Sequence, residues 1–229
     1  MVDVGYLVRR GLGALATGLI VLGSILFIGA GELAWVQAWV LLGLLVAMLC
    51  VNFLVLVRVN RELLEVRVRP ERGARRWDKV VLGATTFLWL GSLVLAGLDR
   101  RWGWSAPFPI LAAVVGACLF VAGDLLILWA MAVNRFFTRL VRIQQERGHS
   151  VVRAGPYRYV RHPGYIGWSL MCVSMPLVLG SWWGLAAAVA SVGGIVVRTV
   201  FEDATLRREL PGYAEYAHQI RWRLLPYVW

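Results

Sequence analysis

Long runs of apolar residues constrain the fold of this chain more than any other feature. Its 229 residues have a mean hydropathy of +0.67, and 59% of them are hydrophobic. A helix needs about 20 such residues to cross a bilayer, and lipid cannot satisfy the open edges of strands. The sequence therefore predicts an all-α, multi-pass integral membrane protein. About six transmembrane helices are expected, at Gly11–Ala30, Trp35–Val57, Val80–Leu98, Phe108–Val133, Tyr165–Leu179 and Ser181–Val197.

The last two apolar segments are short, and only Gly180-Ser181 separates them. Segments of that length barely cross a bilayer, so we expect a short helical hairpin there. The first segment follows Arg9 and Arg10, as the core of a signal peptide would. Its apolar run of about 19 residues is longer than such cores usually are, so we expect an uncleaved anchor.

Basic residues are distributed unevenly between the two predicted sides of the membrane. Of the 24 lysines and arginines, all except Arg100 and Arg101 fall in stretches that six helices would place on one side. Positive residues beside transmembrane helices stay in the cytoplasm, so both termini are predicted there. The net charge of +11 suits anionic lipid headgroups, because the arginines lie close to the apolar segments. Membrane lipids are expected partners, and nucleic acid is not.

Cysteine and histidine residues give no sign of a disulfide framework or of a metal site. Cys50, Cys118 and Cys172 each lie inside an apolar segment and lack any paired spacing. The three histidines are scattered among arginines. Zinc sites instead place four such ligands at short, regular spacings. The sequence therefore predicts no bound metal.

The densest run of unusual chemistry is Gly155–Gly167, which reads G-P-Y-R-Y-V-R-H-P-G-Y-I-G. Pro156 and Pro163 restrict the backbone at two corners, and the residue before the second proline, His162, is biased toward extended geometry. A helix that begins after this corner would direct free N–H groups beside Arg161, which suits a carboxylate or phosphate. The alternative is a membrane-surface turn with interfacial tyrosines. The sequence predicts a ligand site at the membrane surface.

Three of the charged residues in or beside the apolar segments are candidates for function. Asp124 lies within the fourth segment, where a carboxylate is either functional or hydrogen-bonded to a neighbouring helix. Arg198 and Glu202 are four residues apart and share one face of a helix. They could form a plain salt bridge. Alternatively, they form a charge-separated site in which the arginine fork holds a carboxylate and the glutamate faces a cationic group.

The C-terminal half resembles the isoprenylcysteine carboxyl methyltransferase family and its phospholipid methyltransferase relatives. The central match is the family's R-H-P-x-Y-x-G motif, and about 100 residues are covered. The matching residues are His149, Gly155-Pro156-Tyr157, Arg161-His162-Pro163-Gly164-Tyr165-Ile166-Gly167, Pro176-Leu177, Gly180-Ser181, Arg198-x-x-x-Glu202-Asp203, Tyr213-x-x-Tyr216, Arg223 and Pro226. Many members have glutamate where this chain has Asp203, and the charge is preserved.

The resemblance implies a methyltransferase that uses S-adenosylmethionine without a Rossmann domain. It implies a cytoplasmic cofactor site formed by the motif loop and by Glu202, and it implies that Arg198 orients an anionic acceptor. His162 is a further catalytic candidate, because either it or Glu202 could accept a proton if the substrate is an amine. The cofactor-binding residues implied are His149, Gly155, Pro156, Tyr157, Val160, Arg161, His162, Pro163, Tyr165, Gly167 and Glu202.

The chain divides at about residue 105. Residues 1–105 hold three transmembrane helices with few polar residues and are expected to serve as a scaffold, whereas residues 106–229 form the catalytic region. A basic stretch lies between the fourth apolar segment and the motif. The spacing of Phe136, Leu140 and Ile143 predicts helical structure in it. A lipid-side opening between the fourth helix and the final hairpin would admit an apolar substrate.

The acceptor and the oligomeric state stay open at this point. A lipidated protein terminus, a small isoprenoid acid or a phospholipid amine would each fit an apolar path that ends at an arginine. A carboxyl O-methyltransferase is favoured over a phospholipid N-methyltransferase. Two alternatives come from other classes: an NADPH-dependent enzyme like the sterol reductases, and a non-catalytic transporter.

Overall fold

The computed structural model describes residues 4–67, 73 and 75–229, and every regular element among them is a helix. The long apolar helices are α1 (Val4–Ala30), α2 (Val36–Val59), α4 (Arg76–Trp102), α5 (Ile110–Val133) and α7 (Trp182–Glu209). The other elements are α6 (Pro163–Leu179), which is apolar but shorter, the small helices α3 (Arg61–Arg67) and α8 (Tyr213–Gln219), and the 3₁₀ turns η1 (Gln145–Arg147) and η2 (Gly155–Arg158). The prediction of an all-α, multi-pass membrane protein is confirmed.

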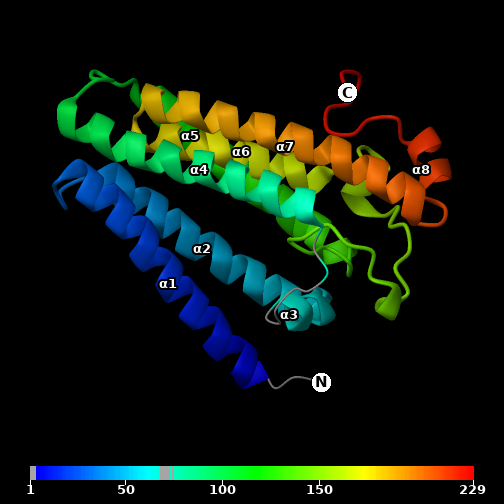
Figure 1. Cartoon of the computed structure of the whole chain (residues 1–229). Helices are drawn as coiled ribbons and strands as arrows, with labels where there is room; N and C mark the ends of the chain where they lie inside the picture. Colours follow the sequence, from blue (N-terminus) through cyan, green and yellow to red (C-terminus); the bar gives the residue numbers. More distant parts are fainter. Residues whose placement is uncertain (1–3, 68–72, 74) are drawn as a thin grey trace.

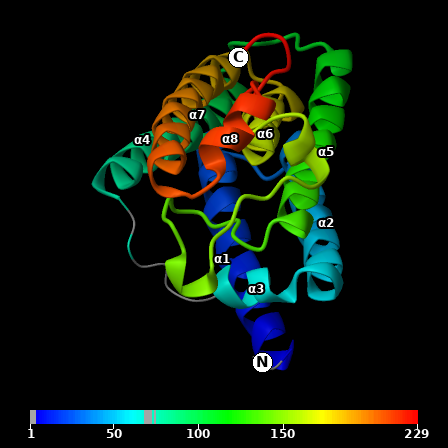
Figure 2. The ribbon, with the colours of Figure 1, turned by 90° about the vertical axis from the view of Figure 1, so that its right-hand side faces the viewer.

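Helices α4, α5, α6 and α7 pack along one another as an elongated bundle (Figure 1). Helices α1 and α2 lie against one side of this bundle. They diverge from it toward the end of the molecule that carries α3 and the beginning of α1 (Figure 1). Seen from the end of the bundle, α8 and the loop after α5 lie across the ends of α6 and α7 (Figure 2). The longest irregular segment is therefore gathered at one end of the transmembrane region.

Glycines bring the backbones of α5 and α6 into direct contact. A Cβ atom added at Gly167 would lie 2.5 Å from the carbonyl oxygen of Gly123, and one added at Gly116 would lie 2.7 Å from the Cβ of Leu177. Larger residues at these positions would push the helices apart, because backbone atoms cannot move aside. The prediction of a lipid-side opening was wrong at these levels, since α5 and α6 are closed against each other.

The hairpin between α6 and α7 turns where it was predicted. Gly180 ends α6 with a positive φ of 79°, a conformation that suits glycine, and the Ser181 hydroxyl accepts a hydrogen bond from the Gly184 N–H. The second helix is longer than the predicted Ser181–Val197, since α7 continues as far as Glu209. Hydropathy marks only the apolar part of a helix, and α7 stays helical where its polar residues find buried partners.

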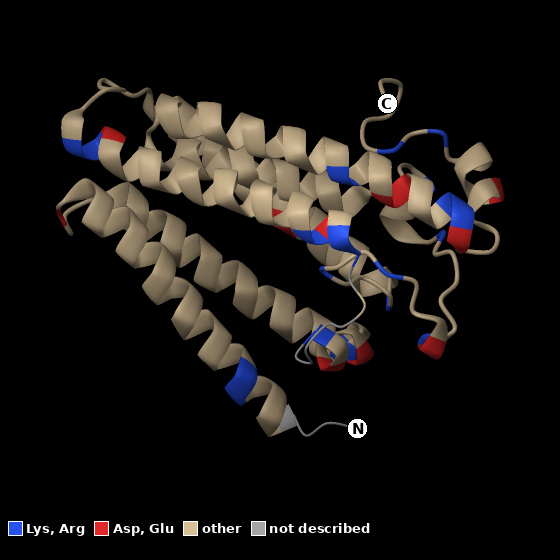
Figure 3. Ribbon diagram, in the orientation of Figure 1, with Lys and Arg blue, Asp and Glu red and all other residues tan. Residues whose placement is uncertain are grey.

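Charged residues gather at the end of the bundle that carries α3, α8 and the loop after α5 (Figure 3). The beginning of α1 and the C-terminal residues lie toward this end (Figure 1), as six membrane crossings would require. Residues 68–72 and 74, which hold part of a predicted basic stretch, lie outside the described residues. At the opposite end Arg100 pairs with Glu32 at 2.7 Å. The cytoplasmic orientation of the charged end remains a prediction.

Asp124 is hydrogen-bonded to a neighbouring helix, which is one of the two alternatives considered for it. The side-chain amide of Asn52 on α2 lies 3.0 Å from both carboxyl oxygens of Asp124 on α5. Both side chains are buried. This contact holds α2 against the helices that carry the motif loop.

Candidate functional site

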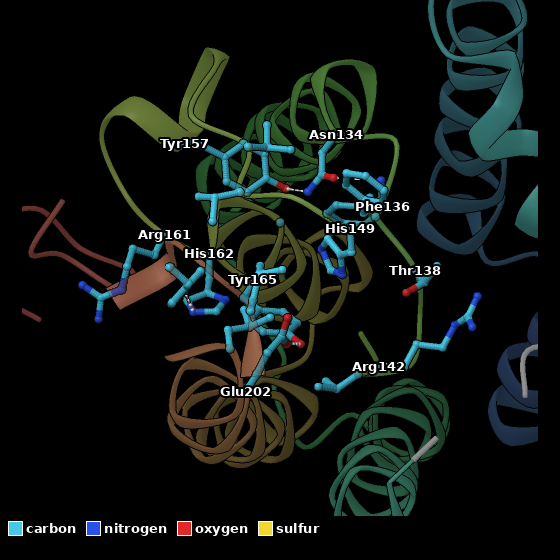
Figure 4. Close-up of a pocket in the computed structure, with 18 of the residues that line it drawn as sticks. Asn134, Phe136, Thr138, Arg142, His149, Tyr157, Arg161, His162, Tyr165 and Glu202 are labelled. Carbon is cyan, nitrogen blue, oxygen red and sulfur yellow. Dashed lines mark hydrogen bonds between the residues drawn. The ribbon is translucent and has the colours of Figure 1, made fainter. Parts of the chain in front are cut away.

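A pocket lies at the charged end of the bundle, between the loop after α5, the start of α6 and the polar end of α7 (Figure 4). The structure brings together seven of the residues predicted from the sequence. They are His149, Tyr157, Arg161, His162, Tyr165, Arg198 and Glu202. Helix α8 completes the wall with Tyr213 and Tyr216.

The other predicted residues do not line this pocket but shape the backbone around it. They are Gly155, Pro156, Val160, Pro163 and Gly167. Gly155 has a positive φ of 57° and packs so closely on α5 that a Cβ would lie 2.9 Å from Trp129 Nε1. Pro163 is the first residue of α6, where its missing N–H is not needed. Their assignment as cofactor-binding residues stays a prediction.

Asp203 of α7 holds the motif loop in place through its side-chain contacts. Its carboxylate is almost fully buried and accepts two parallel bonds from Arg161, at 2.7 and 2.9 Å. The Tyr213 hydroxyl donates to it at 3.0 Å, Arg223 donates at 3.2 Å, and His162 Nε2 lies 3.4 Å away. We call these five residues the Asp203 cluster. Sequence reasoning treated Asp203 only as a preserved charge and missed this role.

The C-terminal segment closes over the motif corner through backbone hydrogen bonds. The N–H groups of Arg161 and His162 donate to the carbonyls of Trp222 and Arg223, each at 3.0 Å. The Arg161 guanidinium also donates to the carbonyls of residues 220 and 221. The sequence predicted a ligand's carboxylate or phosphate beside Arg161, whereas the carboxylate that Arg161 binds in the structure is that of Asp203.

Tyr165, Glu202 and Arg198 form one wall of the pocket. The Tyr165 hydroxyl donates to the carboxylate of Glu202, and its ring stacks on His162 with centroids 5.7 Å apart. The guanidinium carbon of Arg198 lies 5.4 Å from the centre of the Tyr165 ring. Arg198 also pairs with Asp78 of α4 at 2.8 Å. Asp78 lies in the half of the chain expected to be scaffold, and sequence reasoning did not single it out.

The loop after α5 forms no helix over residues 134–144, so the helix predicted from the spacing of Phe136, Leu140 and Ile143 was wrong. The reason is that distant side chains take its backbone groups. The Val141 N–H donates to Asp78 at 2.7 Å, and the Gln144 side chain donates to the Phe136 carbonyl at 2.8 Å. These bonds replace those that a helix would make within itself.

The same loop contributes pocket residues that the sequence did not reveal. Asn134, Phe136, Thr138 and Arg142 line the pocket beside His149. The Asn134 side chain donates to the Tyr157 hydroxyl at 2.9 Å, and burial raises the pKa of Tyr157 above its usual value. That hydroxyl therefore stays protonated and can donate a hydrogen bond. No periodicity would identify these residues, because they lie on an irregular segment.

His149 is held as a neutral imidazole. Burial, together with the positive charges of Arg147 and Arg142, lowers its pKa to about 4. Its ring packs on Phe136 with centroids 4.4 Å apart, and the Gln144 N–H donates to Nδ1 at 3.3 Å. Because Nδ1 accepts this bond, the proton of the neutral ring is on Nε2. His149 thus offers the pocket a hydrogen-bond donor at neutral pH.

Lowering the pH from about 6.5 to about 4 should destabilise the protein through His149. The unfolded residue binds its proton near 6.5 and the folded residue near 4, so the unfolded state holds more protons between these values and the free energy of unfolding falls with pH. Melting temperatures of detergent-solubilised protein across this range would measure the fall. The fall in melting temperature should be smaller in His149→Gln than in the unaltered protein. In His218→Gln, which alters an exposed histidine on α8, it should equal that of the unaltered protein. Equal falls in all three proteins would contradict the assignment.

Comparison with known proteins shows which families the chain resembles. Residues 111–211 match the model of the phospholipid methyltransferase family. The chain is 30% identical over 87 residues to protein-S-isoprenylcysteine O-methyltransferase A of Arabidopsis thaliana, and these cover 38% of this chain and 41% of that protein. It is 28% identical over 127 residues to form B of the same plant, which covers 54% of this chain and 60% of that protein.

A solved structure shares the fold. The eukaryotic intramembrane Ras methyltransferase ICMT (isoprenylcysteine carboxyl methyltransferase) superposes with a TM-score of 0.51 at 19% identity, over 87% of this chain and 71% of that one. The chain spans less than two thirds of the two plant relatives. These matches confirm the resemblance predicted from the R-H-P-x-Y-x-G motif: part of the chain is similar to the plant isoprenylcysteine O-methyltransferases, and residues 111–211 are similar to the phospholipid methyltransferase family.

Proposed function

We propose that this protein is a membrane methyltransferase that moves a methyl group from S-adenosylmethionine to the carboxylate of a lipophilic acceptor, such as an isoprenylcysteine. One observation carries the proposal. Glu202 and Arg198 lie one turn apart on α7 and both line a pocket at the end of a transmembrane bundle. A glutamate and an arginine at the same wall can receive a cationic group and an anionic group side by side.

The residues of the pocket fit S-adenosylmethionine. Glu202 can accept hydrogen bonds from an ammonium group, and across the pocket from it lie Tyr157 and Asn134 (Figure 4). The aromatic ring of Phe136 and the Nε2–H of His149 suit a flat heterocycle that needs both stacking and a donor. When bound, the cofactor supplies a methyl group on a positively charged sulfur. Glu202 would hold it, with the loop after α5 along one side.

The protein's own contribution to the reaction is positioning and the exclusion of water. A carboxylate acceptor is already ionised at neutral pH, so no residue needs to remove a proton from it. Arg198 would orient this carboxylate, since its planar guanidinium donates charge-assisted hydrogen bonds in a fixed direction. Correct alignment of the reacting groups in a site closed to water supplies much of the rate enhancement of such reactions.

Methylation of a phospholipid amine is a second candidate, favoured by the family model that matches residues 111–211. An amine must lose a proton before it attacks. The two residues considered for this from the sequence are His162 and Glu202. Because His162 Nε2 is directed at Asp203 and Tyr213, Glu202 is the better placed of the two. Methyl incorporation into phospholipid instead of a prenylated acid would favour this candidate.

We also propose that the pocket faces the cytoplasm. The charged end of the bundle carries all the arginines of the motif loop and of α8's flanks, whereas Arg100 and Arg101 lie at the other end. Positive residues are retained on the cytoplasmic side. A membrane-embedded acceptor would then present its polar group to a cofactor that arrives from the cytosol.

Glu202→Gln should weaken the binding of S-adenosylhomocysteine by several-fold or more. The amide keeps the size of the side chain but loses the charge that strengthens a hydrogen bond to an ammonium group. Calorimetric titration of the purified protein would measure the affinity. Glu209→Gln is a matched control, because Glu209 lies farther along α7 and is exposed. Failure of the unaltered protein to bind the ligand would overturn the methyltransferase proposal, and equal affinities would remove Glu202 from the site.

A further inference from the structure

Asp78 is the most deeply buried carboxylate beside the pocket that the proposed reaction does not use. It lies in the first turn of α4, and its side chain has no exposed surface. One oxygen accepts from Arg198 Nε at 2.8 Å, and the other accepts from the Val141 N–H at 2.7 Å. Burial of an ionised carboxylate is costly unless its oxygens are satisfied in this way. Asp78 therefore joins three separate parts of the chain: α4, α7 and the loop after α5.

The contacts of Arg198 fix the plane of its guanidinium. Nε donates to Asp78, and Nη2 donates to the carbonyl of Arg139 on the same loop. Among the described residues, Nη1 makes no hydrogen bond. Arg198 lines the pocket and packs against the face of Tyr165. Two of its three nitrogens are thus held by the protein, and the third is left for a ligand.

We propose that Asp78 is a positioning residue for the acceptor. It holds the Arg198 guanidinium so that Nη1 meets an acceptor carboxylate, although Asp78 itself does not touch the acceptor. This inference rests on the proposed function, because it assumes an anionic acceptor at Arg198. The N-terminal half of the chain thereby contributes to acceptor recognition, in addition to its role as a scaffold.

Asp78→Asn tests the proposal with S-isoprenylated N-acetylcysteine as the acceptor. The KM for this acceptor should rise about tenfold or more, because a guanidinium that can rotate no longer directs Nη1 at the acceptor. The affinity for S-adenosylhomocysteine should stay within about twofold, because Glu202 is unaltered. Asp99→Asn is the matched control. Asp99 is equally buried on the same helix, but at the opposite end, where it bonds Ser105 and Ser181. It should change neither quantity.

A double variant separates positioning from a general effect on stability. If Asp78 acts through Arg198, then Asp78→Asn should raise the KM no further when Arg198→Lys is already present. Additive effects, or an unchanged KM in Asp78→Asn, would overturn the proposal. Should Asp78→Asn not fold, Asp78→Glu keeps the ion pair but displaces it, and it should raise the KM with the cofactor affinity retained. A wild-type KM in that variant would also overturn the proposal.

A binding measurement distinguishes failure of this inference from failure of the proposed function. The carboxylate probe and its carboxamide would be titrated into the unaltered protein and into Asp78→Asn. The unaltered protein should prefer the carboxylate, and the variant should lose most of that preference. A preserved difference without any methyl transfer would sink the proposed function and leave the role of Asp78 intact. If methyl transfer occurs and both proteins prefer the carboxylate over the carboxamide equally, the role of Asp78 alone is overturned. If the unaltered protein binds neither probe, the role of Asp78 is overturned as well.

Discussion

Replacement of Arg198 by lysine is expected to reduce methyl transfer on the order of 10²-fold, whereas the affinity for S-adenosylhomocysteine changes little. Lysine keeps the positive charge beside Asp78 but cannot also reach the Arg139 carbonyl in the same plane. The acceptor carboxylate would then be bound in many orientations, and few of them would align with the methyl group. Cofactor contacts through Glu202 would remain.

The measurement is methyl transfer to an S-isoprenylated acceptor alongside titration of S-adenosylhomocysteine, both on the same detergent-purified protein. Arg208→Lys is the matched control, because Arg208 is exposed on the same helix. Equal losses of turnover and of cofactor affinity would assign Arg198 to the cofactor site or to the fold. Normal turnover would return the Arg198–Asp78 pair to a purely structural salt bridge.

Asp203→Asn should cost about 3–5 kcal/mol of stability, because removal of one partner from a buried ion pair leaves the other charge uncompensated. The Arg161 guanidinium is only 3% exposed and would lose the carboxylate that now takes two of its bonds. Tyr213 and Arg223 would lose an acceptor as well. The R-H-P corner depends on all three of these contacts, so cofactor binding should fail together with the fold.

Thermal unfolding in detergent, read as an operational stability, would measure this effect. Glu215→Gln makes the same chemical change at an exposed position on α8 and should leave the melting temperature unchanged. A melting temperature for Asp203→Asn that matches this control would show that the Asp203 cluster is not needed for the fold. Arg161 would then be free to be reconsidered as a cofactor ligand.

Much of the architecture follows from the sequence because lipid removes the alternatives. Where no water can satisfy the backbone, apolar runs must become helices, and their number and approximate positions can be read directly. The hairpin at Gly180-Ser181 was predictable for a similar reason, since glycine alone reaches the left-handed turn cheaply. The motif residues that line the pocket, such as Tyr165 and Glu202, were also selected correctly as neighbours.

The errors have physical reasons too. The loop after α5 has helical spacing at Phe136 and Leu140, but the carboxylate of Asp78 takes the Val141 N–H from more than 60 residues away. Local periodicity cannot show such a competitor. The prediction of a lipid-side opening was wrong at the levels where α5 and α6 touch for a similar reason, because the sequence shows that Gly123 and Gly167 are small but not that they face each other.

By itself, the sequence determined the class of the protein, its membrane environment, its family resemblance and many of the residues that line the pocket. Only the tertiary structure decided how these residues divide between the pocket and its support. It assigned Arg161 to Asp203 and Arg198 to Asp78. The physical reason is that a buried charge must find a partner wherever the fold supplies one. That partner lies at no fixed distance along the chain, so it becomes visible only when the helices have been brought together.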